Sequence, residues 1–418
     1  MAEYILKCID CDKEYLPGDV DYLCPECEIK REEGRSLKGV LRVIYDYDRV
    51  KRDFNEDKLS KKMEEGFVRY FPLLPVHDQS NLPEFIPYRT PLRRAVNLAH
   101  EINLSDLWLK DDTVLPSASF KDRASLSVVS MAREYDRKKI VVASTGNAAS
   151  SLAAVAASVG MESIIIVPES APKAKLAQIA ITGARLIPIM GSYDDAFELS
   201  LKASKEFGWY NRNTAYNPFT IEGKKTAALE IWEQLEYSIP DKIIIPVGDG
   251  CILAGIEKGF SDLLALGFID RLPQLIAVQA TGSSAIVDAF EKGEGDVTPL
   301  ENASSIADSI VVNAPRNARW ALKSLKITNG MGVLVSDEEI LEGMRLLAST
   351  TGIFAEPAAA ATIAGLIKLE KMKMLEPDDL IVALITGHGL KDIVNAQEAV
   401  SIPKAIEPDI DVLKRVLE

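Results

Sequence analysis

The segment IIIPVGDGCILAG, residues 243–255, runs from an apolar stretch through a glycine-rich turn into a helix-forming stretch. The same order recurs along the chain, as in KIVVAST at 139–145 and LIVALITG at 380–387, and helical stretches such as AASSLAAVAASVG at 148–160 separate the apolar runs. Apolar strands that alternate with helices are typical of buried parallel sheets. The sequence therefore predicts an α/β fold with mostly parallel sheets.

Lys121 lies after one of these predicted strands, where the loop SASFKDR at 117–123 becomes a helix. In open α/β sheets, ligands bind at the carboxyl ends of the strands. A lysine that is partly desolvated near a helix start is shifted towards its neutral amine, which is the form that makes an imine. We therefore expect Lys121 to be catalytic, although a surface lysine at a helix start would have the same local sequence.

A second strand end carries STGNAA at 144–149, whose exposed backbone N–H groups suit a carboxylate. The Asn147 amide could reach a substituent of a bound aromatic ring. Simple helix capping would also explain the serine and threonine of this segment. The glycine-rich turn offers successive N–H groups to a phosphate. That turn consists of Gly248, Asp249, Gly250, Cys251 and Ile252. Thr386 follows a fourth strand and would present a hydroxyl, not a carboxylate, to a pyridine nitrogen.

Together, these loops resemble the fold-type II pyridoxal-phosphate (PLP) enzymes, the tryptophan synthase β-like family, and within it most of all the threonine synthases. The resemblance covers residues 85–395. It is carried by SASFKDR (117–123), STGNAA (144–149), PVGDGC (246–251), TGIFAEPAAAA (351–361) and TGHGLKD (386–392). It implies two three-layer α/β domains, a small one at 130–225 and a large PLP-binding one at 41–129 and 226–418, and a homodimer.

The resemblance also implies roles for the loop residues. Lys121 would bind the cofactor and then move protons, and Asn147 would hydrogen-bond the ring hydroxyl. The turn at 248–252 would hold the cofactor phosphate, and Thr386 would face the ring nitrogen. The hydroxyl groups that would help to bind the substrate carboxylate belong to Ser144 and Thr145.

The expected reaction converts O-phospho-L-homoserine and water to L-threonine and phosphate. Threonine synthases usually carry an arginine in a segment like NPFTIEGKKT (217–226), which helps to hold the substrate phosphate, and here Thr220 stands in its place. Lys224 and Lys225 could recover part of this charge. A second segment of the family begins with an arginine that VVNAPRNARW (311–320) lacks, and there Arg316 or Arg319 could compensate. These changes leave two alternatives open: a serine/threonine dehydratase or β-replacement enzyme of the same fold, and a partner-binding protein without activity.

Four of the five cysteines lie in two C-x-x-C pairs near the N-terminus, Cys8 with Cys11 and Cys24 with Cys27. Two such pairs suit one tetrahedral metal ion, so we expect a structural zinc ribbon over residues 1–40. A ribbon that has lost its metal, or an iron site, would have the same spacing. A similar double C-x-x-C opens some threonine synthases.

The net charge of −14 over 418 residues argues against nucleic acid or an anionic membrane as the main partner. The N-terminus lacks a basic stretch followed by an apolar one, so we expect no signal peptide and a cytoplasmic location. Between the ribbon and the main fold, GVLRVIYDYDRV (39–50) predicts a strand and DKLSKKMEEGFVRYFPLLP (57–75) predicts a charged helix with a proline-rich end. Residues 401–418 suggest an extended segment closed by a short helix.

Overall fold

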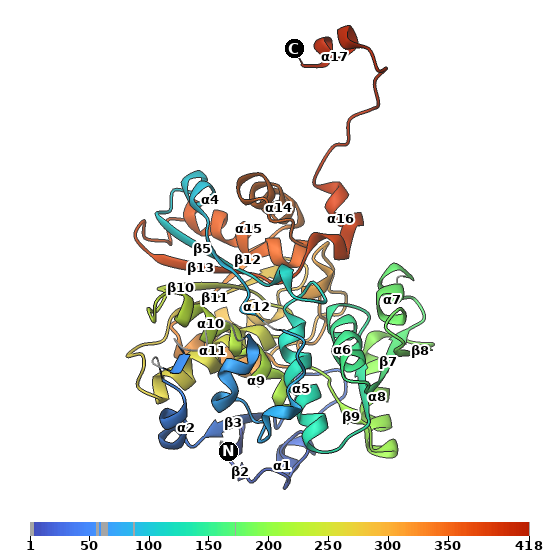
Figure 1. Cartoon of the computed structure of the whole chain (residues 1–418), viewed down its shortest axis with the longest axis vertical. Helices are drawn as coiled ribbons and strands as arrows, with labels where there is room; N and C mark the ends of the chain where they lie inside the picture. Colours follow the sequence, from blue (N-terminus) through green and yellow to red (C-terminus); the bar gives the residue numbers. More distant parts are fainter. Residues whose placement is uncertain (1–3, 56–57, 60–65, 87, 172, 418) are drawn as a thin grey trace.

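The computed structural model describes residues 4–55, 58–59, 66–86, 88–171 and 173–417 (Figure 1). The largest sheet has six strands, which are parallel except for β4 at one edge. In spatial order they are β12 (Met331–Val335), β11 (Gln274–Ala280), β10 (Lys242–Pro246), β13 (Leu380–Ile385), β5 (Asp106–Asp111) and β4 (Leu92–Arg94).

Both faces of this sheet are buried. Ile243 and Ile245 of β10 belong to one core together with Leu253 of α11, whereas Ile244 belongs to another together with Ile363 of α15. Because successive side chains of a strand point to opposite faces, an all-apolar strand supplies both cores. The helices of this part are α4 (Val96–Glu101), α5 (Lys121–Glu134), α9 (Phe219–Lys224), α10 (Thr226–Gln234), α11 (Cys251–Ala265), α12 (Ala285–Glu291), α13 (Ala318–Ile327), α14 (Asp337–Thr351), α15 (Pro357–Lys371) and α16 (Ile393–Glu398).

The second sheet has four parallel strands, β8 (Arg185–Ile189), β7 (Glu162–Pro168), β6 (Lys139–Ala143) and β9 (Tyr210–Asn211) in spatial order. Val142 packs in the core that contains Leu152 of α6 (Asn147–Ser158), and Val141 packs in the core that contains Phe197 of α8 (Tyr193–Phe207). The remaining helix of this part is α7 (Lys173–Ala180). Two three-layer units with mostly parallel sheets confirm the predicted fold class.

The N-terminal segment forms a third, antiparallel sheet of β2 (Glu14–Tyr15), β1 (Tyr4–Cys8) and β3 (Leu41–Tyr45), with the short helix α1 (Pro25–Glu28) beside it. The strand predicted over 39–50 is only partly right. It ends at Tyr45, because the Asp46 side chain accepts a hydrogen bond from the Arg49 N–H at 3.1 Å and begins α2 (Tyr47–Asp53).

Much of the helix predicted over 57–75 lies outside the described residues. Its last part is a 3-10 helix over Phe67–Leu73 that contains Pro72, so the expected α-helix is wrong there. Strands β4, β9 and β12 were not predicted. The chain ends as expected, since residues after α16 extend away from the body and close with α17 (Ile410–Leu417) (Figure 1). In the part of the chain that the structure describes, no helix is long and apolar enough to cross a bilayer.

Candidate active site

Lys121 is the first residue of α5, and the loop before it is fastened to the loop after β13. The N–H of Phe120 donates to the carbonyl of Thr386 at 2.8 Å, and the N–H of His388 donates to the carbonyl of Ala118 at 3.0 Å. Ala118 has a φ of 61°, which is uncommon for a residue other than glycine and is held here by these bonds. The position of the lysine is therefore set by two strands of the large sheet.

The Lys121 amine lies in an environment that favours its neutral form. Burial lowers the pKa of Lys121, and the carboxylate of Glu356 is the strongest influence in the opposite direction. A neutral amine at a pocket wall is the form that attacks a carbonyl carbon or accepts a proton. The local electrostatics therefore suit the chemistry expected of this residue.

Asn147 begins α6, and its side chain points across to the large sheet. The amide Nδ2 donates to the two carboxylate oxygens of Glu356 at 3.0 and 3.1 Å and to the Ser309 hydroxyl at 3.2 Å. In the turn before it, the Gly146 N–H donates to the Ser144 hydroxyl at 3.2 Å. Asn147 thus joins the end of β6 to two segments far away in the sequence.

The glycine-rich turn lies between β10 and α11. Gly250 has a φ of 85°, and α11 begins at Cys251 without a side-chain cap, so its first N–H groups are free for a ligand. A Cβ at Gly248 would lie 2.9 Å from the Cα of Ile310, so only glycine allows this close approach. The carboxylate of Asp249 turns away from these groups, since it accepts from the Arg316 N–H at 2.9 Å.

Lys121, Ser144, Thr145, Asn147 and the turn at 248–252 line one pocket with a cavity volume of about 350 Å³. The pocket is therefore built from the ends of β6 and β10 and the start of α5. Thr386 is buried but is not among the described residues that line the pocket, and its carbonyl bonds to the loop before Lys121. The structure thus brings most predicted site residues together, with Thr386 one layer behind.

Several polar residues of this site were not singled out from the sequence. Tyr193, Arg212 and Ser309 line the pocket, and Glu356 contacts Asn147. Arg212 directly follows β9, whose carboxyl end meets the same edge as β6. A charged residue after a parallel strand is a signal that could have pointed to it, but β9 has only two residues and gives little pattern.

Three of the four cations expected to compensate for the two missing arginines are engaged elsewhere. Lys225 contacts the carboxylates of Glu222 at 2.5 Å and Asp262 at 2.8 Å, and all three side chains are buried. The two arginines are also paired. Arg316 donates to Asp194, and Arg319 donates to Asp10 at 2.7 Å and to Asp296 at 3.1 Å. Only Lys224 has no carboxylate within ion-pair distance among the described residues.

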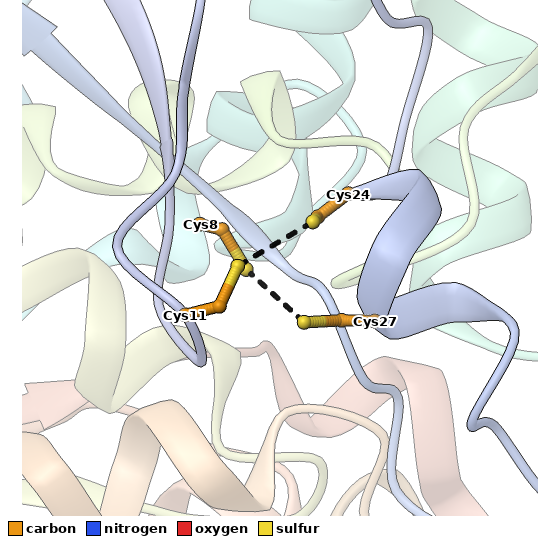
Figure 2. A group of neighbouring side chains, drawn as sticks. All are labelled: Cys8, Cys11, Cys24 and Cys27. Carbon is orange, nitrogen blue, oxygen red and sulfur yellow. Dashed lines mark hydrogen bonds between the residues drawn. The ribbon is translucent and has the colours of Figure 1, made fainter.

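The four N-terminal cysteines converge, as Figure 2 shows. Their sulfur atoms lie within 4.8 Å of one another, with 3.9 Å between Cys8 and Cys27 and 3.6 Å between Cys11 and Cys24. Tetrahedral zinc with Zn–S bonds of about 2.3 Å requires sulfur separations of about 3.8 Å. The geometry of the cluster therefore fits one tetrahedral metal ion.

The site is compatible with PLP on its own geometry. Lys121 supplies the amine, and the uncapped start of α11 suits a phosphate. Residues 84–387 match the family of pyridoxal-phosphate dependent enzymes. The chain belongs to this family.

Its similarity to threonine synthases extends over nearly the whole chain. It is 40% identical to the threonine synthase of Methanocaldococcus jannaschii over 99% of both chains. It is 35% identical to that of Methanosarcina acetivorans, over 99% of this chain and 98% of the relative. These relatives place it among the threonine synthases, within the PLP-dependent enzymes.

Solved structures agree on the fold. The threonine deaminase isoform 2 of Solanum lycopersicum superposes with a TM-score of 0.65 at 21% identity, over 84% of this chain and 95% of that one. The diaminopropionate ammonia lyase of Escherichia coli gives 0.66 at 17% identity, over 83% and 92%. At these identities the likeness concerns the fold alone.

Proposed function

We propose that the protein is a threonine synthase, a PLP-dependent lyase that converts O-phospho-L-homoserine and water to L-threonine and phosphate. The observation that carries this conclusion is the 40% identity over the full length of a threonine synthase. The pocket adds a physical argument. It combines a lysine suited to covalent chemistry with the buried cation Arg212, which favours an anionic substrate.

Each part of the pocket has a task in this proposal. The cofactor, when bound, supplies an electron sink for carbanionic states of the substrate. The Lys121 amine holds the cofactor and moves protons at the substrate carbons, and the start of α11 binds the cofactor phosphate. The Ser144 and Thr145 segment, at the N-terminus of α6, binds the substrate carboxylate. Thr386, the residue that the resemblance assigns to the ring nitrogen, lies behind Lys121 in this structure, and its role stays a prediction.

Three further assignments belong to this proposal. The small domain spans 130–225, and strands β6 to β9 all fall within it. The protein works in the cytoplasm, which agrees with five cysteines that form no disulfide. It forms a homodimer, and the exposed apolar side chains of the C-terminal α17, Ile410, Leu413 and Leu417, offer surface for such an interface.

The proposed metal of the cysteine cluster is a structural zinc ion. Support comes from the four converging thiols and from the Asp10 N–H, which points to the Cys8 sulfur at 3.4 Å. Four thiolates leave no open coordination position for a substrate, so the ion would stabilise the ribbon and take no part in the reaction.

The decisive experiment measures phosphate release and threonine formation from O-phospho-L-homoserine by the PLP-loaded protein. We expect Lys121→Ala to reduce both by at least about 10²-fold, because the proton-transfer group is lost. Lys139→Ala, which removes an exposed lysine at the start of β6, is the matched control and should be as active as the wild type. A wild-type protein that binds PLP but releases no phosphate would favour a dehydratase or β-replacement enzyme, to be examined with serine and threonine.

A further inference from the structure

Two buried cations beside the pocket lack a counter-ion. Arg212 is 1% exposed and lines the pocket; its Nε donates to the Ser125 hydroxyl at 3.2 Å, while its Nη2 has no hydrogen-bond partner. Lys224 is also 1% exposed, and its Nζ reaches only the carbonyl of Thr220 at 3.3 Å and the hydroxyl of Thr214 at 3.5 Å. Among the described residues, neither cation has a carboxylate within 4.0 Å.

This situation is unusual for the interior of this protein. The other fully buried cations of the surrounding helices have close carboxylates: Lys225 with Glu222 and Asp262, Lys258 with Asp262, and Arg123 with Asp112 and Glu230. A buried charge without a partner is costly, so such a group is stable in its charged form only where a counter-ion, a metal or a ligand compensates it. Arg212 and Lys224 therefore indicate a missing anion.

Burial lowers the pKa of both groups, to about 10 for Arg212 and to about 7 for Lys224. Burial also lowers the pKa of the paired Lys258, so the missing carboxylate and not the pKa distinguishes these two cations. Both groups also lie near Cys251, at the first turn of α11, and the two cations repel one another. An anion between them would offset the desolvation and the repulsion at once.

Three anionic groups enter this pocket in the proposed reaction: the cofactor phosphate, the substrate carboxylate, which is assigned to the segment of Ser144 and Thr145, and the substrate phosphate. The turn at 248–252 and the start of α11 already provide N–H groups for one of them. Lys224 lies on α9, on the helix face of Thr220 and one turn further along, since positions i and i+4 share a face. It is thus placed next to the position where related sequences carry an arginine.

We propose that Arg212 and Lys224 form the subsite for the phosphate group of the substrate, an inference that rests on the proposed function. The planar guanidinium of Arg212 can bind two phosphate oxygens at once, and Lys224 adds a second positive charge from α9. The hydroxyl of Thr214, which lines the pocket, lies between Lys224 and the cavity. The charge absent at Thr220 is in this way supplied from β9 and from the next turn of α9.

The test uses the PLP-loaded protein, in which the cofactor phosphate is already in place. Binding of inorganic phosphate is measured by calorimetry, and KM and kcat are measured with O-phospho-L-homoserine. In Arg212→Gln and in Lys224→Gln, we expect phosphate affinity to fall and KM to rise by about 10- to 100-fold each. Arg212→Lys, which keeps the charge, should recover part of the phosphate affinity and reverse part of the increase in KM. Arg319→Gln, an arginine paired outside the pocket, is the control and should behave as the wild type.

The outcomes separate this inference from the proposed function. Unchanged phosphate binding in the Arg212 and Lys224 variants, or a loss of PLP affinity with phosphate binding intact, would overturn the subsite. If Arg212→Gln does not fold, the Lys224→Gln variant decides by the same criteria. If the wild type binds phosphate through Arg212 but does not act on O-phospho-L-homoserine, the subsite stands and the proposed function fails. Turnover with unaffected variants would leave the function standing without the subsite.

Discussion

Two groups of buried cations in this protein differ in one respect, the presence of a carboxylate. Behind the pocket, Arg123 contacts Asp112 at 2.7 Å and Glu230 at 2.7 Å, and Lys110 contacts Glu230 at 2.5 Å. These cations hold the pKa of Glu230 at about 2, despite complete burial. At the pocket, burial instead lowers the pKa of Arg212 to about 10, since no carboxylate lies close to it among the described residues.

The comparison separates structural charge from functional charge. A satisfied network joins α5, α10 and strand β5 and leaves no capacity for a ligand. An unpaired cation beside a cavity carries a desolvation cost that a bound anion would offset. Burial of a cation alone therefore does not indicate a binding site, whereas a buried cation that lies beside a cavity and lacks a carboxylate partner does.

The cysteine cluster is the counterpart of the two unpaired cations: four thiolates lie together and require a positive ion. Its prediction has the largest expected effect on stability. Isolated zinc-binding peptides gain about 10–16 kcal/mol from metal binding at neutral pH. We expect Cys8→Ser together with Cys11→Ser to abolish zinc binding, measured as metal per chain, and to lower the melting temperature. The absorbance of bound PLP should remain, because none of the four cysteines of the cluster lines the pocket.

A loss of PLP in this variant would show that the ribbon supports the site directly. A path for such support exists. The Leu37 N–H donates to the Arg316 carbonyl at 3.0 Å, and the Arg316 N–H donates to the Asp249 carboxylate at 2.9 Å. Wild-type protein that contains no zinc, with the same melting curve as the variant, would contradict the zinc assignment.

The sequence predicted the sheets better than the site. Strands such as β10 and β13 are apolar on both faces, so each carries its signal in five or six consecutive residues. Strand β9 has two residues and no such signal. At 39–50, the apolar pattern continued past the true end of β3, and the capping role of Asp46 was overlooked.

The predicted roles of the site residues remain predictions, but their proximity could be inferred because strand ends of parallel sheets meet at one edge. What a linear sequence does not contain is the list of partners. Asn147 and Glu356 are 209 residues apart, and Lys225 and Asp262 are 37 apart. Such long-range contacts decide that Lys225 is paired with the Asp262 carboxylate and that, among the described residues, the neighbouring Lys224 has no such partner.

The second prediction tests the comparison through stability. Glu230→Gln leaves Arg123 and Lys110 with too little negative charge in a fully buried place, so we expect a destabilisation of about 3–5 kcal/mol. Arg212→Gln removes an unpaired charge and should be neutral or stabilising in phosphate-free buffer. Urea midpoints of both variants give the measurement. Equal destabilisation by the two substitutions would mean that Arg212 belongs to a structural network after all.

The third prediction concerns pH and has the smallest effect. Burial lowers the pKa of Lys224 to about 7, so this amine loses its charge as the pH rises through 7, while Arg212, with a pKa of about 10, keeps its charge. Sulfate affinity of the PLP-loaded protein should therefore fall by about tenfold between pH 6 and pH 8.5. Sulfate is the suitable probe because its own charge stays constant over this range, unlike that of phosphate.

In Lys224→Gln, sulfate binding should be weak and independent of pH over the same range. In the absence of an anion, the pH dependence of the protein's stability has the opposite sign. Folded Lys224 holds its proton less tightly than the unfolded lysine does, so the unliganded wild type should gain stability as the pH rises from 7 towards the unfolded pKa of 10.5, by linkage. We therefore expect two opposite trends: anion affinity falls as the pH rises, whereas the stability of the unliganded protein increases. This combination is expected of a buried cation whose counter-ion is a ligand. If the unliganded protein instead lost stability over this range, the pKa of folded Lys224 would be raised and not lowered, and its assignment as an unpaired buried cation would be wrong.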